Sequence, residues 1–283
     1  MSPRATVAIM STGDMGSAVG ALLVAGGHRV VTPVGGRDRR TVERAREAGI
    51  VALPDLAAAI GEAELIVSVV PPDRALAVAV DVRAASGAAR RGAVYLDANS
   101  IAPATVGRVA DELAATPLEL VDGAVYGSSS RLAGHGTVLL SGPAAERVAD
   151  MVGSALPVRV VGDRVGQASA RKMLLAGLTK GLCALILDLA AIADAAGELG
   201  PALGDYREFY PGVMELVDRM LPTYRHHGRR RAEELRELAQ LAHELGVDAP
   251  MLAEAEGVTR RLATPGEGPA LLTRVLEDIH ASR

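Results

Sequence analysis

The chain has 283 residues, of which 49% are hydrophobic, and it carries a formal net charge of −4. This composition allows a sizeable buried core and excludes global disorder. The net negative charge excludes a broad basic field, and five tyrosines and one phenylalanine leave little for base stacking, so no nucleic-acid partner is expected. The length is about twice a typical domain of roughly 150 residues, which predicts two domains.

The cysteine and the apolar segments indicate in which cellular compartment the protein is expected. The single cysteine, Cys183, lies in an apolar run and cannot form an internal disulfide, which fits a reducing compartment. Asp188 interrupts the best candidate for a membrane span, and the apolar run over residues 5–10 is too short for a signal peptide. We therefore expect a soluble, cytoplasmic protein with no membrane partner. The histidines lack further ligands at metal-site spacing, so no metal is expected.

In the first part of the chain, up to about residue 163, short apolar runs alternate with longer amphipathic segments. This alternation predicts a parallel, doubly wound α/β sheet, and the short links between strands toward residue 140 predict antiparallel strands at its end. Strands are predicted over residues 6–10, 29–34, 65–70, 93–97, 118–121, 137–140 and 158–161. Helices are predicted over residues 17–25, 39–48, 74–85 and 104–114.

The rest of the chain reads as helical. Residues 166–196 contain no proline and are apolar nearly all round, which predicts a buried helix about 45 Å long. Such a helix would join two domains or lie in a subunit interface. Further helices are predicted over residues 206–220, 229–246, 251–261 and 269–280. Within this part, the basic cluster at residues 226–231 is interpreted as a solvated loop, the alternative being an arginine donated to the site of a partner subunit.

A glycine-rich loop follows the first predicted strand and precedes a helix. Its sequence, Ser-Thr-Gly-Asp-Met-Gly over residues 11–16, matches the dinucleotide fingerprint G-x-G-x-x-G with serine in the first glycine place. Gly13 would let the backbone approach a pyrophosphate at the helix N-terminus, and Gly16 would allow close packing of the helix. The alternative is a glycine-rich turn in another α/β protein. Cofactor contacts are expected from Ser11, Thr12, Gly13, Asp14 and Met15.

The segment after the second strand distinguishes the two nicotinamide cofactors. A carboxylate there would bind the ribose hydroxyl of NAD, whereas arginine accommodates the 2′-phosphate of NADP. Arg37 occupies the position after the second strand from which the first discriminating side chain should project toward the cofactor. Arg39, Arg40 and Thr41 lie close enough in sequence to supply further hydrogen-bond donors to a phosphate. The alternative is a solvated charge run, but arginines at a helix N-terminus oppose the helix dipole. The sequence therefore favours NADP(H).

Lysine is scarce in this chain. Of 30 basic residues, the only lysines are Lys172 and Lys180, both on the long predicted helix. A desolvated lysine releases a proton in the useful pH range and arginine does not. The two lysines are about 80° apart around the helix and roughly 12 Å apart along it, so both could reach one cleft. The alternative is that either side chain extends to solvent.

Several segments together carry a resemblance to a known family. They are the glycine loop, residues 97–103, residues 122–128 with Gly136-Thr137, and residues 166–172. In this order they resemble the β-hydroxyacid dehydrogenase superfamily, which includes 3-hydroxyisobutyrate and 6-phosphogluconate dehydrogenases and imine reductases. The helical half is most similar to a phosphogluconate-dehydrogenase-like branch with a C-terminal domain of unknown function.

The resemblance implies an architecture that agrees with the pattern of elements. It implies an α/β Rossmann N-terminal domain plus an all-α C-terminal domain, joined by a long interdomain helix. The end of the strand pattern places the boundary near residue 163, so the predicted domains are residues 1–163 and 164–283. It also implies a homodimer with the active site between the domains.

The resemblance assigns roles to individual residues. Lys172 matches the catalytic lysine, a general acid when a carbonyl is reduced and a base in reverse, which requires its pKa to fall toward about 7 or 8. Other matching positions lie along the cofactor or the substrate. Those at the cofactor are Val70, Pro71 and Asn99, and those at the substrate are Ser100, Tyr126, Gly127 and Ser128.

The chain also departs from the family pattern. Leu175 and Ala176 stand where the family has an asparagine that holds the substrate, so Lys180 or Tyr126 is expected to supply an alternative contact. The expected function is an NADPH-dependent oxidoreductase acting on a small carbonyl or β-hydroxy acid. One alternative is an imine reductase, although most of these carry aspartate or tyrosine at the position of Lys172. The other is a non-catalytic, NADP-sensing binding protein.

Overall fold

The computed structural model describes residues 4–263 and 269–281. They form two compact units, and the chain divides between Lys172 and Met173. The last strand ends at Gly162, and helix α8 (Gln167–Ala195) begins in the first unit and continues into the second. The units therefore divide inside this helix, whereas the sequence placed the domain boundary at residue 163.

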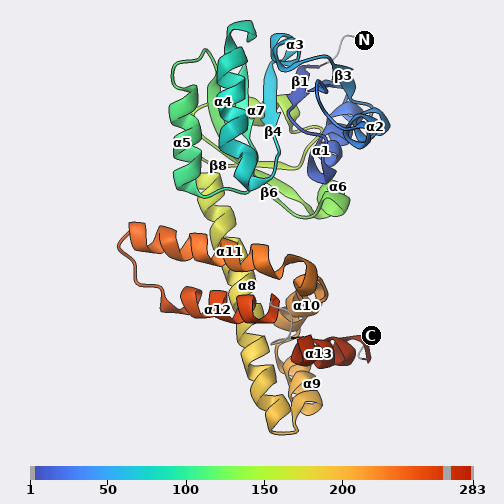
Figure 1. Ribbon diagram of the computed structural model, residues 1–283, viewed down its shortest axis with the longest axis vertical. Coiled ribbons are helices and arrows are strands. Elements are labelled where there is room, and N and C mark those ends of the chain that lie inside the picture. Colours follow the sequence, from blue (N-terminus) through green and yellow to red (C-terminus); the bar gives the residue numbers. More distant parts are fainter. Residues whose placement is uncertain (1–3, 264–268, 282–283) are drawn as a thin grey trace. The chain divides into compact units, whose positions relative to one another are not determined.

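The first unit contains one sheet in the described part of the chain (Figure 1). Its strand order is β3-β2-β1-β4-β5-β6-β7-β8. Strands β1 to β6 are parallel, β7 is antiparallel to β6, and β8 is parallel to β7. This arrangement confirms the predicted doubly wound sheet and its antiparallel end. The strands are β1 (Thr6–Ile9), β2 (Arg29–Pro33), β3 (Val51–Leu53), β4 (Leu65–Ser68), β5 (Val94–Asp97), β6 (Glu119–Tyr126), β7 (Thr137–Ser141) and β8 (Val158–Gly162).

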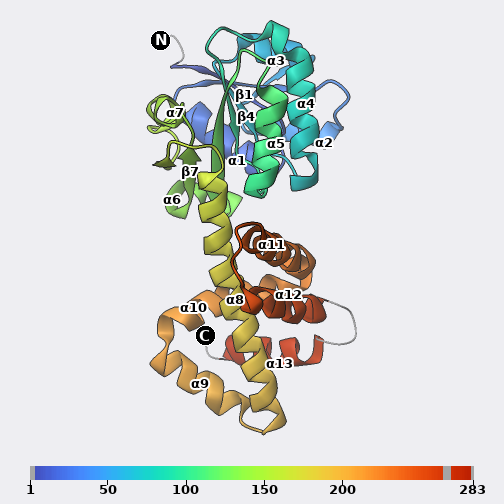
Figure 2. The ribbon, with the colours of Figure 1, turned by 90° about the vertical axis from the view of Figure 1, so that its left-hand side faces the viewer.

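Helices cover both faces of this sheet (Figure 2). One face packs against α1 (Asp14–Ala25), α2 (Arg39–Glu47) and α7 (Ala145–Val152). The other packs against α3 (Leu56–Glu62), α4 (Ala75–Ala85) and α5 (Pro103–Leu113). Short helical segments complete the unit, namely η1 (Pro72–Arg74), η2 (Ser86–Ala88), η3 (Ser129–Arg131) and α6 (Leu132–His135). Of these elements, β3, α3, α7 and the short helical segments were not predicted. Strand β3 and the shortest segments have too few residues to show a periodicity, whereas α7 buries Ala145, Val148 and Val152 at helical spacing, a signal that the sequence analysis overlooked.

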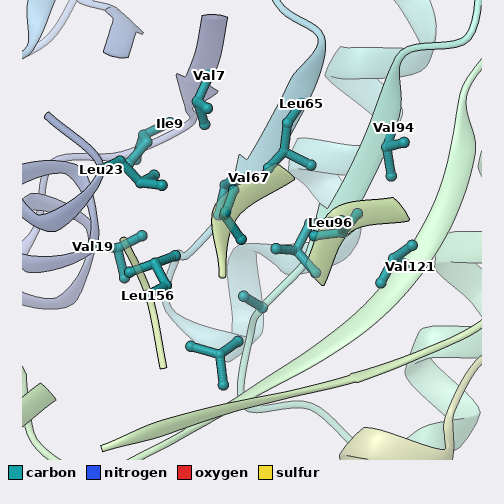
Figure 3. Close-up of a cluster of buried hydrophobic side chains, with 14 of the residues drawn as sticks. Val7, Ile9, Val19, Leu23, Leu65, Val67, Val94, Leu96, Val121 and Leu156 are labelled. Carbon is teal, nitrogen blue, oxygen red and sulfur yellow. The ribbon is translucent and has the colours of Figure 1, made fainter. Parts of the chain in front are cut away.

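Strand β1 shows how the sheet separates the two cores. Val7 and Ile9 point into the cluster on the α1 face (Figure 3), while Ala8, between them, belongs to the cluster on the α4 face. All three are completely buried. Burying a large aliphatic side chain stabilises the fold by about 1.5–3 kcal/mol. Because successive residues of a strand point to opposite faces, packing on both faces holds the strands, and therefore their carboxyl ends, in place.

The second unit is all-helical in its described residues. It contains the rest of α8, which is followed by α9 (Leu199–Phe209), α10 (Pro211–Met220), η4 (Leu221–Thr223), α11 (Tyr224–Glu244), α12 (Pro250–Ala263) and α13 (Pro269–Ala281). Cys183 and Leu187 of α8 share one buried cluster with Leu235 of α11 and Leu272 of α13. The all-α C-terminal domain predicted from the sequence is confirmed.

Two details of the helical part correct the sequence prediction. The single helix predicted over residues 206–220 is wrong, because α9 ends at Phe209 and α10 begins at Pro211. Proline has no N–H to donate to the preceding turn, but it fits the first position of a new helix. The basic cluster at residues 226–231 lies inside α11 rather than in a loop. Its last member, Arg231, is buried over the ring of Tyr224, 4.5 Å from the ring centroid.

Helix α8 is long and apolar enough to cross a membrane by length and composition, in the part of the chain that the structure describes. Of its most apolar stretch, 39% is buried within the structure. A core helix of a protein without any membrane span can be equally long and apolar, so length and composition do not show whether α8 lies in a membrane or in a protein core.

Candidate active site

The glycine loop joins β1 to α1 and has the shape that a dinucleotide requires. A Cβ on Gly13 would meet no atom within 4 Å, whereas a Cβ on Gly16 would lie 1.9 Å from the carbonyl oxygen of Ser11. Gly16 is therefore needed for packing, while Gly13 leaves the backbone open at the start of α1. Among the described residues only glycines have positive φ, so Ser11 fits the first glycine place without strain. The loop fits a pyrophosphate at the helix N-terminus.

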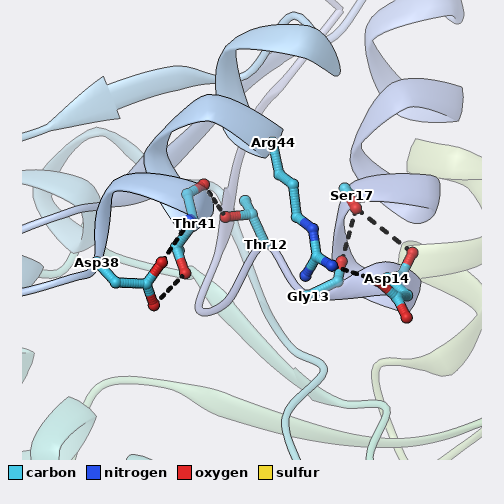
Figure 4. Close-up of polar contacts among 7 residues, drawn as sticks. All are labelled: Thr12, Gly13, Asp14, Ser17, Asp38, Thr41 and Arg44. Carbon is cyan, nitrogen blue, oxygen red and sulfur yellow. Dashed lines mark hydrogen bonds and ion pairs between the residues drawn. The ribbon is translucent and has the colours of Figure 1, made fainter.

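Thr12 ties this loop to α2. It is completely buried, and its hydroxyl donates a hydrogen bond of 2.9 Å to the carbonyl of Thr41 (Figure 4). The backbone N–H and the hydroxyl of Thr41 in turn donate to Asp38, the N-cap of α2. These bonds lower the pKa of Asp38. The hydroxyl of Thr41, predicted to face a phosphate, is thus used within the protein. The sequence analysis missed Asp38, although an aspartate directly before a predicted helix is a cap signal.

Arg44 is a second residue that the sequence analysis missed. Its guanidinium lies 3.0 Å from the carboxylate of Asp14, at the first residue of α1 (Figure 4). This ion pair partly compensates the negative charge that Asp14 places beside the proposed pyrophosphate position. A shallow, open depression of about 350 Å³ lies alongside. Its polar lining comes from α1, α2 and η3, through Asp14, Ser17, Arg44, Glu47, Ser129 and Ser130.

The arginines predicted to bind a phosphate differ in their surroundings. Arg37 is exposed, and its guanidinium donates a long hydrogen bond of 3.4 Å to the carbonyl of Met10 at the end of β1. Arg39 forms an ion pair of 2.7 Å with Glu43, and 91% of its side chain is exposed. Arg40 is exposed. Arg37 is thus the arginine of this group that contacts the strand leading into the glycine loop.

Asn99 joins the ends of β4 and β5. Its side-chain oxygen accepts a hydrogen bond of 2.7 Å from the N–H of Val70, and its amide nitrogen donates one of 3.0 Å to the hydroxyl of Ser68. The residue is 2% exposed. Asn99, predicted to contact the cofactor, therefore uses both ends of its amide to hold the backbone before Pro71. A direct contact of this side chain with a cofactor stays a prediction.

Lys172 and Ser100, assigned to catalysis and to substrate, come together in the first unit. The ammonium of Lys172 donates a hydrogen bond to the hydroxyl of Ser100, the residue after Asn99. Lysine and serine thus meet at the carboxyl ends of the parallel strands, the edge where open α/β sheets bind their ligands. A lysine ammonium and a hydroxyl at such an edge can exchange a proton with a bound molecule.

The predicted substrate segment follows the end of β6. Tyr126 is 40% exposed and pairs with Thr137 of β7. Gly127 has a φ of +127°, a conformation that side-chain-bearing residues rarely adopt, and a Cβ on it would lie 3.0 Å from the Cα of Gly136. Ser128 is exposed, and its hydroxyl lies 3.2 Å from that of Ser130. The strand pair therefore closes a loop that presents hydroxyl groups.

Lys180 has a different environment from Lys172. It is 5% exposed, its ammonium lies 2.5 Å from a carboxylate oxygen of Glu234 in α11, and it also donates to the carbonyl of Ala176. This ion pair lies in the helical unit. A substrate contact by Lys180 stays a prediction, and the visible partner of its charge is a protein carboxylate.

Two buried carboxylates near the site were also missed. Asp97 of β5 and Asp122 of β6 are register partners, and they are 1% and 0% exposed. Burial raises the pKa of Asp97 to about 6, with a further contribution from the charge of Asp122. Acidic residues inside otherwise apolar strand segments are the sequence signal for such a pair. Among the described residues, no group of three or more metal-ligating side chains is close enough to hold a metal ion.

Comparison with known proteins agrees with this geometry. Residues 6–155 match the NAD-binding domain of 6-phosphogluconate dehydrogenase, and residues 193–262 match a domain of unknown function, DUF1932. The chain belongs to the β-hydroxyacid dehydrogenase superfamily. One relative in sequence is an uncharacterised 28.5 kDa protein of Methanothermus fervidus. It is 28% identical over 219 residues, which cover 76% of this chain and 83% of the relative.

Solved structures that match nearly the whole chain share its fold. A conserved protein of unknown function, MTH1747, described as similar to 3-hydroxyacid dehydrogenases, is 27% identical, with a TM-score of 0.77 over 94% of this chain and 99% of its own. The 3-hydroxyisobutyrate dehydrogenase of Mycobacterium tuberculosis, solved with L-serine, is 16% identical, with a TM-score of 0.78 over 99% of this chain and 99% of its own. An imine reductase variant of Myxococcus stipitatus, solved with NAD⁺, is 20% identical, with a TM-score of 0.67 over 98% of this chain and 100% of its own. The scaffold is thus shared by NAD(P)-dependent hydroxyacid dehydrogenases and imine reductases.

Proposed function

We propose that the protein is an NADPH-dependent oxidoreductase that transfers a hydride between the nicotinamide and a small carbonyl or β-hydroxy acid substrate. The observation that carries this proposal is the hydrogen bond between Lys172 and Ser100 at the carboxyl edge of the sheet. An ammonium in this position can deliver a proton where a carbonyl oxygen gains negative charge.

Each part of the first unit has a task in this reaction. The cofactor supplies or accepts the hydride at the nicotinamide ring. The open backbone at Gly13 and the N-terminus of α1 hold its pyrophosphate, and Arg37 and Arg40 hold the 2′-phosphate. Lys172 protonates the carbonyl oxygen during reduction and takes the proton back during oxidation. Ser100 accepts a hydrogen bond from Lys172 and so orients its ammonium.

The substrate is proposed to be a small oxo or hydroxy compound with an acidic or polar group. Tyr126, the last residue of β6, and Ser128 supply exposed hydroxyl groups, and Gly127 supplies the turn between them. A cyclic imine is the alternative substrate, because imine reductases share this fold. Loss of chemistry with retained NADP binding is the remaining alternative.

The first experiment separates these possibilities. Binding of NADPH and NADH is followed by nicotinamide fluorescence, which tryptophan does not obscure because the chain contains none. Turnover is then screened on hydroxy acids, aldehydes and cyclic imines, with Lys172→Met as the control. Selective NADPH binding with turnover that needs Lys172 supports the proposal. Binding of NADPH without turnover on any panel member supports a binding protein, and failure to bind either nucleotide contradicts both.

We also propose that the protein is a cytoplasmic homodimer in which a second copy covers α8. Leu174, Leu178, Leu185 and Ile192 are 61%, 64%, 46% and 67% exposed. Their spacing places them within about 40° around the helix, so they form one apolar stripe, here called the α8 stripe. Within it, a Cβ on Gly181 would meet no atom within 4 Å, which leaves room for a second helix to approach closely.

A further inference from the structure

Asp122 lies in the middle of β6 and is completely buried. Its carboxylate accepts hydrogen bonds from the hydroxyl of Ser169 at 2.6 Å, from the N–H of Ser169 at 3.0 Å and from the hydroxyl of Ser141 at 3.1 Å. No lysine or arginine in the described residues forms an ion pair with it. Burying a carboxylate costs several kcal/mol unless hydrogen-bond donors surround it. The donors from Ser169 and Ser141 are therefore needed to keep Asp122 in this buried position.

These bonds attach the start of α8 to the sheet. The first N–H groups of a helix have no partner within the helix, and a negative charge is favourable beside them. Asp122 on β6 binds the N–H of Ser169, and the hydroxyl of Ser141 on β7 accepts a hydrogen bond of 2.9 Å from the N–H of Ala168. Two successive N–H groups of the first turn are therefore held by two neighbouring strands.

Lys172 lies one turn beyond this attachment. Ser169 and Lys172 are three residues apart, which places them about 60° apart around the helix and about 4.5 Å apart along it. Ser100, the partner of Lys172, follows β5, and β5 and β6 are paired so that Asp97 lies opposite Asp122. The sheet thus determines the positions of both partners, Ser100 through β5 and Lys172 through Asp122 and Ser169.

We propose that Asp122 is a positioning residue for the proton transfer. It does not touch the substrate; it fixes the rotation and height of the first turns of α8, so that the ammonium of Lys172 meets Ser100. This inference rests on the proposed function of Lys172. A displacement of a reacting group by about 1 Å can reduce a rate by up to about 100-fold, so an anchor of this kind affects catalysis directly.

The kinetic test compares two variants with a matched control. Asp122→Asn keeps the shape but removes the charge, and Ser169→Ala removes the hydroxyl donor. Glu119→Gln is the control, because Glu119 lies on the same strand but is exposed and pairs with Arg147 at 3.0 Å. We expect Asp122→Asn to lower kcat about 10-fold or more and to move the pH profile of kcat, with KM and the Kd for NADPH within about twofold. Ser169→Ala should lower kcat about threefold, and Glu119→Gln should leave it unchanged.

A second readout needs no substrate. Reductive methylation with ¹³C-formaldehyde labels lysine amines, and with so few lysines in the chain the Lys172 signal is assigned by its loss in Lys172→Arg. We expect the midpoint of its pH titration to move in Asp122→Asn and in Ser169→Ala, but not in Glu119→Gln. If Asp122→Asn does not fold, Ser169→Ala carries the test.

The two readouts separate the inference from the proposed function. A moved Lys172 titration in a protein that neither binds NADPH nor turns over substrate supports the anchor while the proposed function fails. Turnover that needs Lys172, together with an unmoved titration and an unchanged kcat in both variants, overturns the anchor alone. Equal losses of kcat and of NADPH affinity, with a lowered melting temperature, would also overturn it, because they indicate a merely structural effect.

Discussion

The ammonium of Lys180 and the carboxylate of Glu234 lie 2.5 Å apart within the helical unit, and they link α8 to α11. The Lys180 side chain is 6% exposed, so removal of its partner would leave a buried charge uncompensated. We predict that Glu234→Gln lowers the free energy of unfolding by about 3 kcal/mol, measured by urea denaturation.

The adjacent residue provides the control for this prediction. Glu233 pairs with Arg236 at 2.8 Å, but both side chains are more than half exposed. Exposed pairs contribute about 0–1 kcal/mol, so Glu233→Gln should change stability by less than about 0.5 kcal/mol. Equal effects of the two substitutions would show that the buried pair does not stabilise the unit.

Ser100 should matter for turnover more than for binding. We predict that Ser100→Ala lowers kcat about 10-fold, because Lys172 loses the hydroxyl that orients it, while Lys172→Met lowers kcat by about 10² to 10⁴. The Kd for NADPH should change by less than about twofold in both. Arg171→Met, at the exposed neighbour of Lys172, is the control. Full turnover by Lys172→Met at neutral pH would contradict the catalytic assignment.

Cofactor preference should depend on Arg37 more than on Arg39. Arg37→Ala is predicted to weaken NADPH binding by about 10-fold or more and NADH binding by less than about twofold, since only NADPH carries the 2′-phosphate. Arg39 is already paired with Glu43, so Arg39→Ala should weaken NADPH binding by less than about threefold. Fluorescence titration measures both. Equal losses for NADH and NADPH in Arg37→Ala would show that this arginine does not contact the phosphate.

The raised pKa of Asp97 predicts a pH-dependent stability. Its pKa of about 6 in the folded protein lies above the ordinary value of about 3.9, so the folded state binds the proton more tightly than the unfolded state. This contribution is fully present below about pH 4 and is lost as the pH rises through about 6, a difference of about 3 kcal/mol.

Asp97→Asn tests this explanation. An amide remains uncharged, and its oxygen can still accept the hydrogen bond of 3.0 Å from the N–H of Asn99. Compared with the wild type, the variant should gain stability progressively between pH 4 and pH 7, in urea denaturation at several pH values. A difference that does not vary with pH would mean that Asp97 does not titrate in this range.

The α8 stripe predicts the oligomeric state. The wild type should have twice the chain mass of 29.1 kDa by light scattering, and Leu178→Glu should shift it toward the single-chain mass. Leu245→Glu, at a leucine that is 70% exposed but lies outside the stripe, should leave the dimer intact. A monomeric wild type that sediments with lipid vesicles would instead indicate that the stripe contacts a membrane.

The sequence predicted the features of the fold that depend on local pattern. The strand-loop-helix unit around Gly13, the alternation that produces the doubly wound sheet, and the long helix α8 were all visible in periodicity and turn residues. Errors arose where local pattern was short or ambiguous. Strand β3 has only three residues, and the break between Phe209 and Pro211 depends on one proline within a continuous helical pattern.

The site was predicted less completely, because its contacts join distant parts of the chain. Family resemblance assigned Lys172 to catalysis and Ser100 to the substrate, but neither the resemblance nor any spacing rule predicted the hydrogen bond between them. The bonds from Asp122 to Ser169, and from Arg44 to Asp14, depend on how strands and helices pack in three dimensions. Local sequence could have suggested Asp38 as a helix cap, but it could not have shown that Lys180 would pair with Glu234.

The closed base of the loop over residues 127–136 has an evolutionary consequence. Tyr126 and Thr137 pair as the last rungs of β6 and β7, and Gly127 and Gly136 lie nearly in contact beneath the loop. The sheet therefore ends at this base, but the loop is not independent of the core, because Leu132, between the two glycines, is 1% exposed and packs in the cluster on the α1 face. A scaffold built in this way can vary its exposed loop residues, such as Ser128 and Ser130, and still keep the loop in place as long as Leu132 is retained.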